Sequence, residues 1–253
     1  MKKVLIFLFT AIFLCINSVY AEKIPTAGDN VSHFSVGRKY KDANWKTINK
    51  MKTQAKNLSD EEKGVIRKYI FGAVRGEDTY LLINCYLRDT LEYYIPQKEI
   101  TKPLKCRLEF YANSLSIPVT KIKLPKNMIL YRGIDEKGMR ILFANKKINN
   151  LINGAVSESN AEALKKHLAG TTFTEKGFMS TSYDKSAAKQ TKFMFEVYAP
   201  KNLQAVLLED LGKKQEKEVL INKNSNWEIV NIRTDINKKT KKSYYLITIK
   251  YSL

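Results

Sequence analysis

The sequence predicts an α+β fold in which N-terminal helices pack on a mainly antiparallel β-sandwich core. From about residue 38 to 118, apolar and charged residues recur at spacings of three and four, which is the period of an amphipathic helix. From about residue 125 to 253, the chain consists of short runs rich in β-branched and aromatic residues between polar turns. With 44% hydrophobic residues in 253, a packed core is expected, and a disordered chain or a disulfide-stapled miniprotein is excluded.

Two helices of the first half have recognisable boundaries. Ser59 followed by Glu62 is a capping box, so a helix is expected to begin there. A second helix is predicted from Asp78 to Tyr94, where Pro96 stops it.

The second half contains one more predicted helix among its strands. Ser159 with Glu162 indicates another capping box, and Gly170 is placed to end that helix. The run 238–242, four lysines and a threonine, is predicted to be a solvated hairpin turn. Seven strands are predicted: Met128–Arg132, Gly177–Ser182, Lys192–Tyr198, Ala205–Glu209, Glu216–Ile221, Trp227–Arg233 and Ser243–Tyr251. Strands after a helical first half favour an α+β fold.

The first 21 residues have the pattern of a secretory signal peptide. Two lysines precede the apolar run Val4–Leu14, and small residues at positions −3 and −1 predict cleavage after Ala21. A membrane anchor is the alternative, but the run is shorter than the ~20 residues that a spanning helix needs. Lipidation at Cys15 is disfavoured by the bulky residues before it. We therefore expect a secreted protein whose residues 22–253 form a single domain without a transmembrane span.

The chain is strongly basic. It has 44 Lys and Arg against 25 Asp and Glu, a formal net charge of +19. Removing residues 1–21 takes away two lysines and no acid, so the remainder carries +17. Such a charge favours anionic partners, such as phosphates, nucleic acid, acidic proteins or anionic lipid. The basic residues are dispersed and no nucleic-acid-binding motif is present, so no specific nucleic acid is expected.

Histidine and cysteine are scarce. The two histidines, His33 and His167, leave little for a metal site or a Ser-His-Asp triad, so no metal is expected. Outside the predicted signal peptide, Cys85 and Cys106 are compatible either with one disulfide or with two buried free thiols.

Three short motifs in predicted strands carry the residues suited to chemistry. Arg132 ends the first strand, Ser180-Thr181-Ser182 lies in the second, and Glu216-Lys217-Glu218 opens the fifth. Residues two apart in a strand face the same side, so both glutamates are expected to project together. Each motif has an ordinary structural explanation on its own, as a surface arginine, as cross-strand hydrogen bonds or as an exposed strand start. Their order along one chain points instead to a shared site.

This ordered signature resembles that of the bacterial mono-ADP-ribosyltransferase toxins. It is similar to that of the enzymatic components of clostridial binary toxins, the vegetative insecticidal toxin and the single-domain Rho-modifying exoenzymes. Upstream, Tyr69–Phe71 and Tyr80–Arg88 resemble the helix that packs over the NAD site in those enzymes. The resemblance spans about residues 40–253 and implies the ADP-ribosyltransferase fold, with NAD+ as co-substrate and without a metal.

The resemblance also implies residues that bind NAD+. Arg132 would hold the phosphates, Gly133 would allow close approach, and Arg88 would be a second, weaker phosphate contact. A guanidinium suits this role because its fork makes bidentate bonds to phosphate. Phe178 would pack near the nicotinamide. The remaining expected contacts come from the upstream helices: Tyr69 and Asn84.

The catalytic roles follow in the same way. Glu218 would bond the 2′-hydroxyl of the nicotinamide ribose and stabilise the oxocarbenium ion that forms as the glycosidic bond breaks. Ser180 would orient Glu218. Glu216 would orient and deprotonate the nucleophile, and a glutamate here, where the Rho-modifying relatives have Gln, marks arginine as the acceptor.

The expected function is that of a secreted, monomeric toxin that ADP-ribosylates an arginine of actin or another host protein inside a host cell. NAD+ glycohydrolysis on the same fold and non-catalytic binding by a basic protein are the alternatives. Two departures from the pattern of these relatives leave the target protein open. The segment 209–215 lacks the aromatic that many relatives use to recognise their target, with Leu211 as its only apolar candidate. No arginine follows Ser-Thr-Ser where actin-modifying relatives have one.

Overall fold

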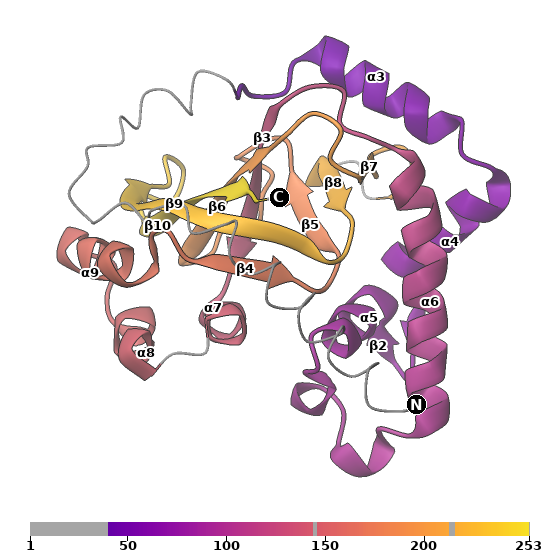
Figure 1. Cartoon of the computed structure of the whole chain (residues 1–253), viewed down its shortest axis with the longest axis horizontal. Coiled ribbons are helices and arrows are strands. Elements are labelled where there is room, and N and C mark those ends of the chain that lie inside the picture. Colours follow the sequence, from indigo (N-terminus) through magenta and orange to yellow (C-terminus); the bar gives the residue numbers. More distant parts are fainter. Residues whose placement is uncertain (1–39, 144–145, 213–215, 253) are drawn as a thin grey trace, which may run out of the picture. The chain divides into compact units, whose positions relative to one another are not determined.

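An eight-stranded sheet forms the centre of the molecule (Figure 1). The computed structural model describes residues 40–143, 146–212 and 216–252, so the predicted signal peptide lies outside the described residues. The strand order is β4-β9-β10-β6-β3-β5-β8-β7, and every pairing is antiparallel except that of β10 with β6. The strands are β3 (Met128–Ile134), β4 (Thr172–Glu175), β5 (Met179–Ser182), β6 (Phe193–Ala199), β7 (Ala205–Leu207), β8 (Glu218–Ile221), β9 (Ser225–Ile236) and β10 (Ser243–Tyr251).

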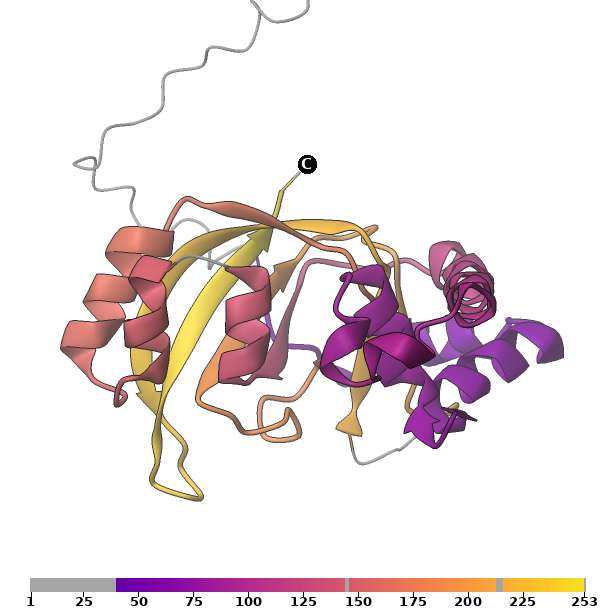
Figure 2. The same ribbon diagram turned by 90° about the horizontal axis from the view of Figure 1, so that it is seen from below.

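The helices form two groups, as the view in Figure 2 shows by colour. The N-terminal group is α3 (Trp45–Lys56), α4 (Asp60–Phe71), α5 (Thr79–Leu87) and α6 (Lys102–Lys121), with a two-residue hairpin of β1 (Ala73–Val74) and β2 (Glu77–Asp78) before α5. The later group is α7 (Glu136–Leu142), α8 (Lys146–Asn153) and α9 (Glu158–Leu168). The predicted α+β class, with N-terminal helices and a mainly antiparallel sheet, is confirmed.

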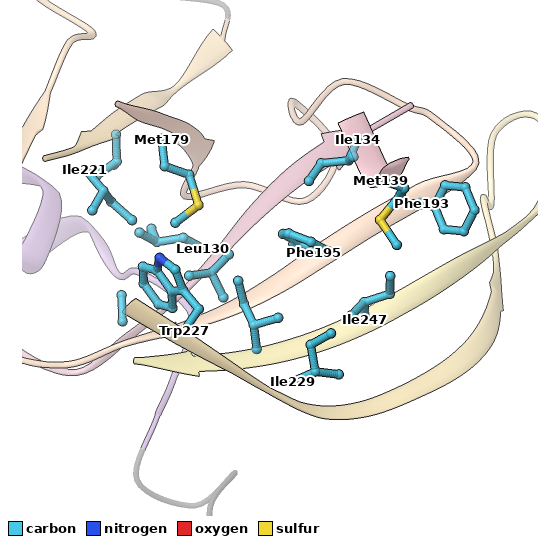
Figure 3. Packing of buried hydrophobic residues seen from close by; sticks show 14 of the residues in the cluster. Leu130, Ile134, Met139, Met179, Phe193, Phe195, Ile221, Trp227, Ile229 and Ile247 are labelled. Carbon is cyan, nitrogen blue, oxygen red and sulfur yellow. The ribbon is translucent and has the colours of Figure 1, made fainter. Parts of the chain in front are cut away.

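Of the three hydrophobic clusters among the described residues, two join the helices to the sheet. The larger one lies inside the curved sheet, where side chains such as Leu130, Phe195 and Trp227 point toward one another (Figure 3). The second joins α4, α5 and α6 to Phe178, just before β5, and to the outer side of β7 and β8 through residues such as Leu82 and Leu220. The helical half therefore packs beside the start of the strand with Ser-Thr-Ser and on the strand that Glu218 opens.

The helix boundaries are partly as predicted. Ser59 and Glu62 form a reciprocal capping box at the start of α4. The predicted helix Asp78–Tyr94 is too long: α5 ends at Leu87 and Asp89 takes a positive φ of 57°, so the chain turns before a short 3₁₀ segment. The capping box predicted at Ser159 is also wrong, because Ser157 and not Ser159 accepts the capping bond of α9.

The strands follow the prediction more closely. The bounds of β10 are those expected, and the turn 238–242 joins β9 to β10. The short strand β4 was not predicted, since its Thr-Phe-Thr-Glu sequence offers only four residues of alternation. The strand expected from Glu216 begins only at Glu218.

Neither cysteine forms a disulfide in the structure. Cys85 is buried and Cys106 is exposed, so the expectation of two buried thiols holds for Cys85 alone. Within the described ranges, no helix is long and apolar enough to cross a membrane. The same residues contain no cluster of three or more His, Cys, Asp or Glu that could hold a metal ion.

Candidate active site

Glu175, which ends β4, and the three residues that join β4 to β5, Lys176–Phe178, lie along the C-terminal end of α5. The backbone N–H of Phe178 donates a hydrogen bond of 2.8 Å to Oδ1 of Asn84. Nζ of Lys176 lies 3.0 Å from a carboxylate oxygen of Asp89. We call these four residues the 175–178 connection. Because the Ser-Thr-Ser motif follows directly in β5, the end of α5 sets where that motif begins.

Glu175, the last residue of β4, is a buried carboxylate at this contact, with 1% of its surface exposed. Its two oxygens accept hydrogen bonds from Nε and Nη2 of Arg88, at 2.8 and 3.0 Å. Oε1 also accepts one from the backbone N–H of Gly177, at 2.9 Å. Nη1 of Arg132 lies 3.5 Å from Oε2. Glu175 therefore joins two arginines from different elements, the end of α5 and strand β3.

The two arginines are not paired equally. Burial acts to lower the pKa of Arg88, but the charge and hydrogen bonds of Glu175 together raise it above its ordinary value. Burial lowers the pKa of Arg132, and Glu175 offsets only part of that effect. Nη1 of Arg132 is buried and has no hydrogen-bond partner in the part of the chain that the structure describes. Arg132 is thus the arginine with capacity left for an anion.

Asn84 holds the helical wall of the site together. Its Nδ2 donates a hydrogen bond of 2.9 Å to the hydroxyl of Tyr69, while its Oδ1 accepts from Phe178. The rings of Tyr69 and Phe178 pack edge to face, with 5.8 Å between their centroids. All three side chains are buried. Phe178 therefore belongs to the core that supports the site, and the amide of Asn84 is hydrogen-bonded within the protein.

Two glycines permit close packing around these groups. A Cβ on Gly133 would lie 1.9 Å from the carbonyl oxygen of Lys189, so the close approach expected there is made by the chain's own backbone. At Gly177, a Cβ would lie 2.7 Å from Oδ1 of Asn84 and 3.0 Å from Nη2 of Arg88. Gly177 was not predicted to have a role, and the only signal for it in the sequence is a glycine three residues before Ser180.

Glu218 stands at the other side of the same site. It opens β8 and pairs with Ser182 of β5, and Ser180 lies diagonally from it because alternate residues of a strand share a face. Burial and then the charge of Glu218 raise the pKa of Tyr69. The same charge acts on Arg132, whose pKa burial lowers. The structure thus brings Glu218, Ser180, Tyr69 and Arg132 together.

The Glu-x-Glu turn, Glu216–Glu218, is not the regular strand that was expected. Lys217 has a positive φ of 47°, so Glu216 precedes a sharp turn and is exposed, whereas Glu218 is half-buried at the strand start. The expectation that both glutamates belong to one strand is therefore wrong, although both act on the hydroxyl of Tyr80. Nζ of Lys217 lies 2.6 Å from Asp184, and its carbonyl accepts the N–H of Tyr183. The turn is anchored by the residues that directly follow Ser-Thr-Ser.

Tyr80 is a further residue of this region that was not predicted as part of the site. Its ring packs edge-on against Tyr69, with 6.3 Å between centroids, and 42% of its surface is exposed. Burial and then Asp78, with smaller effects from Glu216 and Glu218, raise the pKa of its hydroxyl. Tyr80 therefore offers an exposed aromatic face beside both glutamates.

The segment before the turn is fixed at its start. Oε2 of Glu209 accepts a hydrogen bond of 3.3 Å from the hydroxyl of Tyr183 and lies 3.1 Å from Nζ of Lys52. Burial and the neighbouring Glu209 raise the pKa of Tyr183 to about 12. Leu211, the apolar candidate for target recognition, is buried among the helices. It contributes to the core and is not available to a partner.

Comparison with protein families shows to which family a chain with this site belongs. The model of the ADP-ribosyltransferase exoenzymes matches residues 42–252. The chain belongs to the ADP-ribosyltransferase exoenzyme family. The match covers both the helical half and the sheet, so this exoenzyme has all the elements that carry the site described above. No curated protein sequence matches the chain.

Solved structures share the fold of this exoenzyme. Plx2a, an ADP-ribosyltransferase toxin from Paenibacillus larvae, aligns with a TM-score of 0.62 at 23% identity over 82% of this chain and 93% of that one. C3stau2 from S. aureus, solved with NAD, aligns with a TM-score of 0.60 at 15% identity over 82% and 93%. BECa, an ADP-ribosylating toxin of a C. perfringens binary enterotoxin solved with NADH, gives 0.63 at 22% identity over 87% of this chain and 48% of its own.

Proposed function

We propose that this exoenzyme transfers ADP-ribose from NAD+ to an arginine of a host protein and releases nicotinamide. The observation that carries the proposal is the meeting of Arg132 and Glu218 beside Tyr69, from strands far apart in the sequence, within a chain of this family. The guanidinium of Arg132 suits the phosphates of the donor, and the carboxylate of Glu218 suits the positive charge of the transition state.

NAD+ fits the charges of the site. A diphosphate would supply the hydrogen-bond acceptor that Nη1 of Arg132 lacks among the described residues, and a guanidinium binds phosphate oxygens through paired N–H donors. The C3stau2 and BECa structures contain NAD and NADH respectively, which supports the same donor here. We assign Arg132 as the main phosphate contact and Tyr69, Asn84 and Phe178 as the wall behind it.

The chemistry divides between the two glutamates. The bond between C1′ of the ribose and the nicotinamide nitrogen breaks, and its electron pair leaves with nicotinamide. Glu218, oriented by Ser180, stabilises the positive charge that grows at C1′ by bonding the 2′-hydroxyl. A guanidinium nitrogen of the acceptor then attacks C1′, and Glu216 receives the proton that this nitrogen loses. With water as the nucleophile, the same steps hydrolyse NAD+.

The surroundings of Tyr80 support arginine as the acceptor. In a chain with a net charge of +19, this exposed ring has three carboxylates acting on it, from Asp78, Glu216 and Glu218. An aromatic face beside carboxylates suits a guanidinium, which binds both. The host protein, actin or another, is a matter for labelling experiments.

The same proposal includes the organisation of the chain. Residues 1–21 act as a signal peptide cleaved after Ala21, and residues 22–253 are a single catalytic domain that works as a monomer inside a host cell. The family match over residues 42–252 supports one catalytic domain, and membership of an exoenzyme family supports secretion.

The test is to incubate the protein with labelled NAD+ and agmatine, a small arginine mimic, and to measure ADP-ribosyl-agmatine and free ADP-ribose. Wild type is expected to form both products, and Glu218→Gln neither. Glu216→Gln is expected to lose the agmatine product and keep NAD+ hydrolysis. Absence of both products from wild type, or an unchanged Glu218→Gln variant, contradicts the proposal. Hydrolysis alone by wild type favours a glycohydrolase.

A further inference from the structure

Glu175 takes no part in the reaction as proposed, yet it is the most deeply buried charge beside the arginines. Only 1% of its side chain is exposed, against 18% for Arg88 and 19% for Arg132. A carboxylate in such a place is costly unless it is paired and hydrogen-bonded. Both of its oxygens are bonded, and its partners include the arginine assigned to the phosphates.

Glu175 contacts the two arginines to different extents. Nε and Nη2, which form one edge of the Arg88 guanidinium, are both used by Glu175. That edge is one of the two with which an arginine binds a phosphate in bidentate fashion, and on Arg88 it is not available to a ligand. Arg132 makes a single longer contact of 3.5 Å through Nη1. At that distance Nη1 has no hydrogen-bond partner among the described residues, so it can still bind a second anion.

We propose that Glu175 is a positioning residue that fixes Arg88 in a structural ion pair and leaves Arg132 as the arginine that binds the diphosphate of NAD+. This inference rests on the proposed function of the site. It also changes the role expected for Arg88, from a direct phosphate contact to a support that acts through Glu175.

The physical reason is charge balance before the ligand arrives. Two guanidinium groups side by side repel each other, and the carboxylate between them allows both to stay in place. The cluster of Arg88, Glu175 and Arg132 then carries one net positive charge, directed at the ligand through Arg132. Because Glu175 also accepts the N–H of Gly177, the same carboxylate fixes the start of β5. NAD+ thus meets a prearranged site and little reorganisation is needed.

The experiment measures KM for NAD+ and kcat of NAD+ hydrolysis in Glu175→Gln, Arg88→Gln and the double variant. In Glu175→Gln, KM is expected to rise about tenfold while kcat stays within about twofold of wild type, because the donor site is misplaced and Glu218 is untouched. Glu175→Asp keeps the charge and is expected to recover part of the loss. The double variant is expected to be no worse than Glu175→Gln alone, since Arg88 acts through Glu175.

Glu196→Gln is the matched control. Glu196 is a buried glutamate of β6 that accepts a hydrogen bond of 3.0 Å from Thr248 and lies 3.7 Å from Arg233, so its loss disturbs the sheet without touching the arginine pair. Its KM for NAD+ is expected to stay unchanged.

Three results overturn the inference. An unchanged or lower KM in Glu175→Gln shows that the carboxylate is not needed or competes with the diphosphate. A further rise in KM in the double variant shows that Arg88 contacts the ligand itself. An equal rise in Glu196→Gln shows that the effect is only structural. If Glu175→Gln does not fold, Glu175→Asp with and without Arg88→Gln decides in the same way. Wild type that neither binds nor hydrolyses NAD+ refutes the proposed function instead.

Discussion

The two halves of the site are held in different ways. The 175–178 connection is fixed to the end of α5 by buried contacts at two of its residues, Phe178 and Glu175, and both oxygens of Glu175 are bonded to Arg88. The Glu-x-Glu turn depends on a partly exposed ion pair, Lys217 with Asp184, and on a backbone conformation unusual for lysine. The first half would bind NAD+ and the second would face the acceptor. The structure is thus rigid where the ligand is constant and more easily altered where the target varies.

The largest effect is expected from Arg132→Lys in the rigid half. Lysine keeps the charge but loses the planar fork, and hydrogen bonds between charged groups contribute about 1.5–3 kcal/mol each. We expect kcat/KM for NAD+ hydrolysis to fall by about a hundredfold. The control is Arg233→Lys, because Arg233 is half-exposed on Glu196 and outside the site. A loss of similar size in the control would contradict the assignment.

Gly177→Ala tests how tightly the 175–178 connection is packed. The added methyl would lie 2.7 Å from Oδ1 of Asn84, so the contact with α5 has to open. Overpacking of this kind costs about 1–3 kcal/mol, which urea unfolding measures, and KM for NAD+ should rise with it.

Gly64→Ala in α4 is the matched control. A Cβ there meets nothing within 4 Å, and alanine favours a helix over glycine by up to about 1 kcal/mol. The control should therefore be as stable as wild type or more so. Equal stability of Gly177→Ala and wild type would mean that the connection is loose.

The sequence predicted the architecture because its signals are local. Capping at Ser59, the run of aromatic and β-branched residues in β10 and the lysine turn before it each depend on a few neighbouring residues, and the structure confirms them. The end of α5 and the start of α9 were misplaced because a positive φ at Asp89 and the choice between Ser157 and Ser159 leave no clear local pattern.

The site was predicted by motif and missed where it depends on tertiary contacts. Arg132 and Glu218 stand out by their spacing and resemblance, and the structure brings them together. Nothing local distinguishes Glu175 from other surface glutamates, because its burial comes from α5, which lies far away in the sequence. The bend at Lys217 was missed for the same reason, since the anchor is Asp184.

Asp184→Asn tests the weaker half through pH. Hydrogen bonds from Lys217 and then Ser186 lower the pKa of Asp184 to about 2, from 3.8. Because its pKa is lower in the folded than in the unfolded state, Asp184 adds to the free energy of unfolding above about pH 4. This contribution is lost as the pH falls toward 2. Because the pair is partly exposed, we expect the variant to lose less than about 1 kcal/mol near neutral pH. Urea midpoints should converge with wild type near pH 2, and a constant difference would contradict the assignment.

The smallest effect on stability is expected from Lys217→Gly, because two terms oppose each other. Glycine relieves the left-handed backbone, worth about 1 kcal/mol, but loses the ion pair with Asp184 and adds entropy to the unfolded chain. Lys217→Ala keeps the strain and loses the pair, so it should be the less stable of the two by urea unfolding. Both variants release Glu216 from its anchored turn while leaving Glu218 in β8. Transfer to agmatine should therefore fall relative to NAD+ hydrolysis in both. An unchanged product ratio would mean that the turn does not position Glu216, and a parallel loss of both products would mean that Glu218 depends on the turn as well.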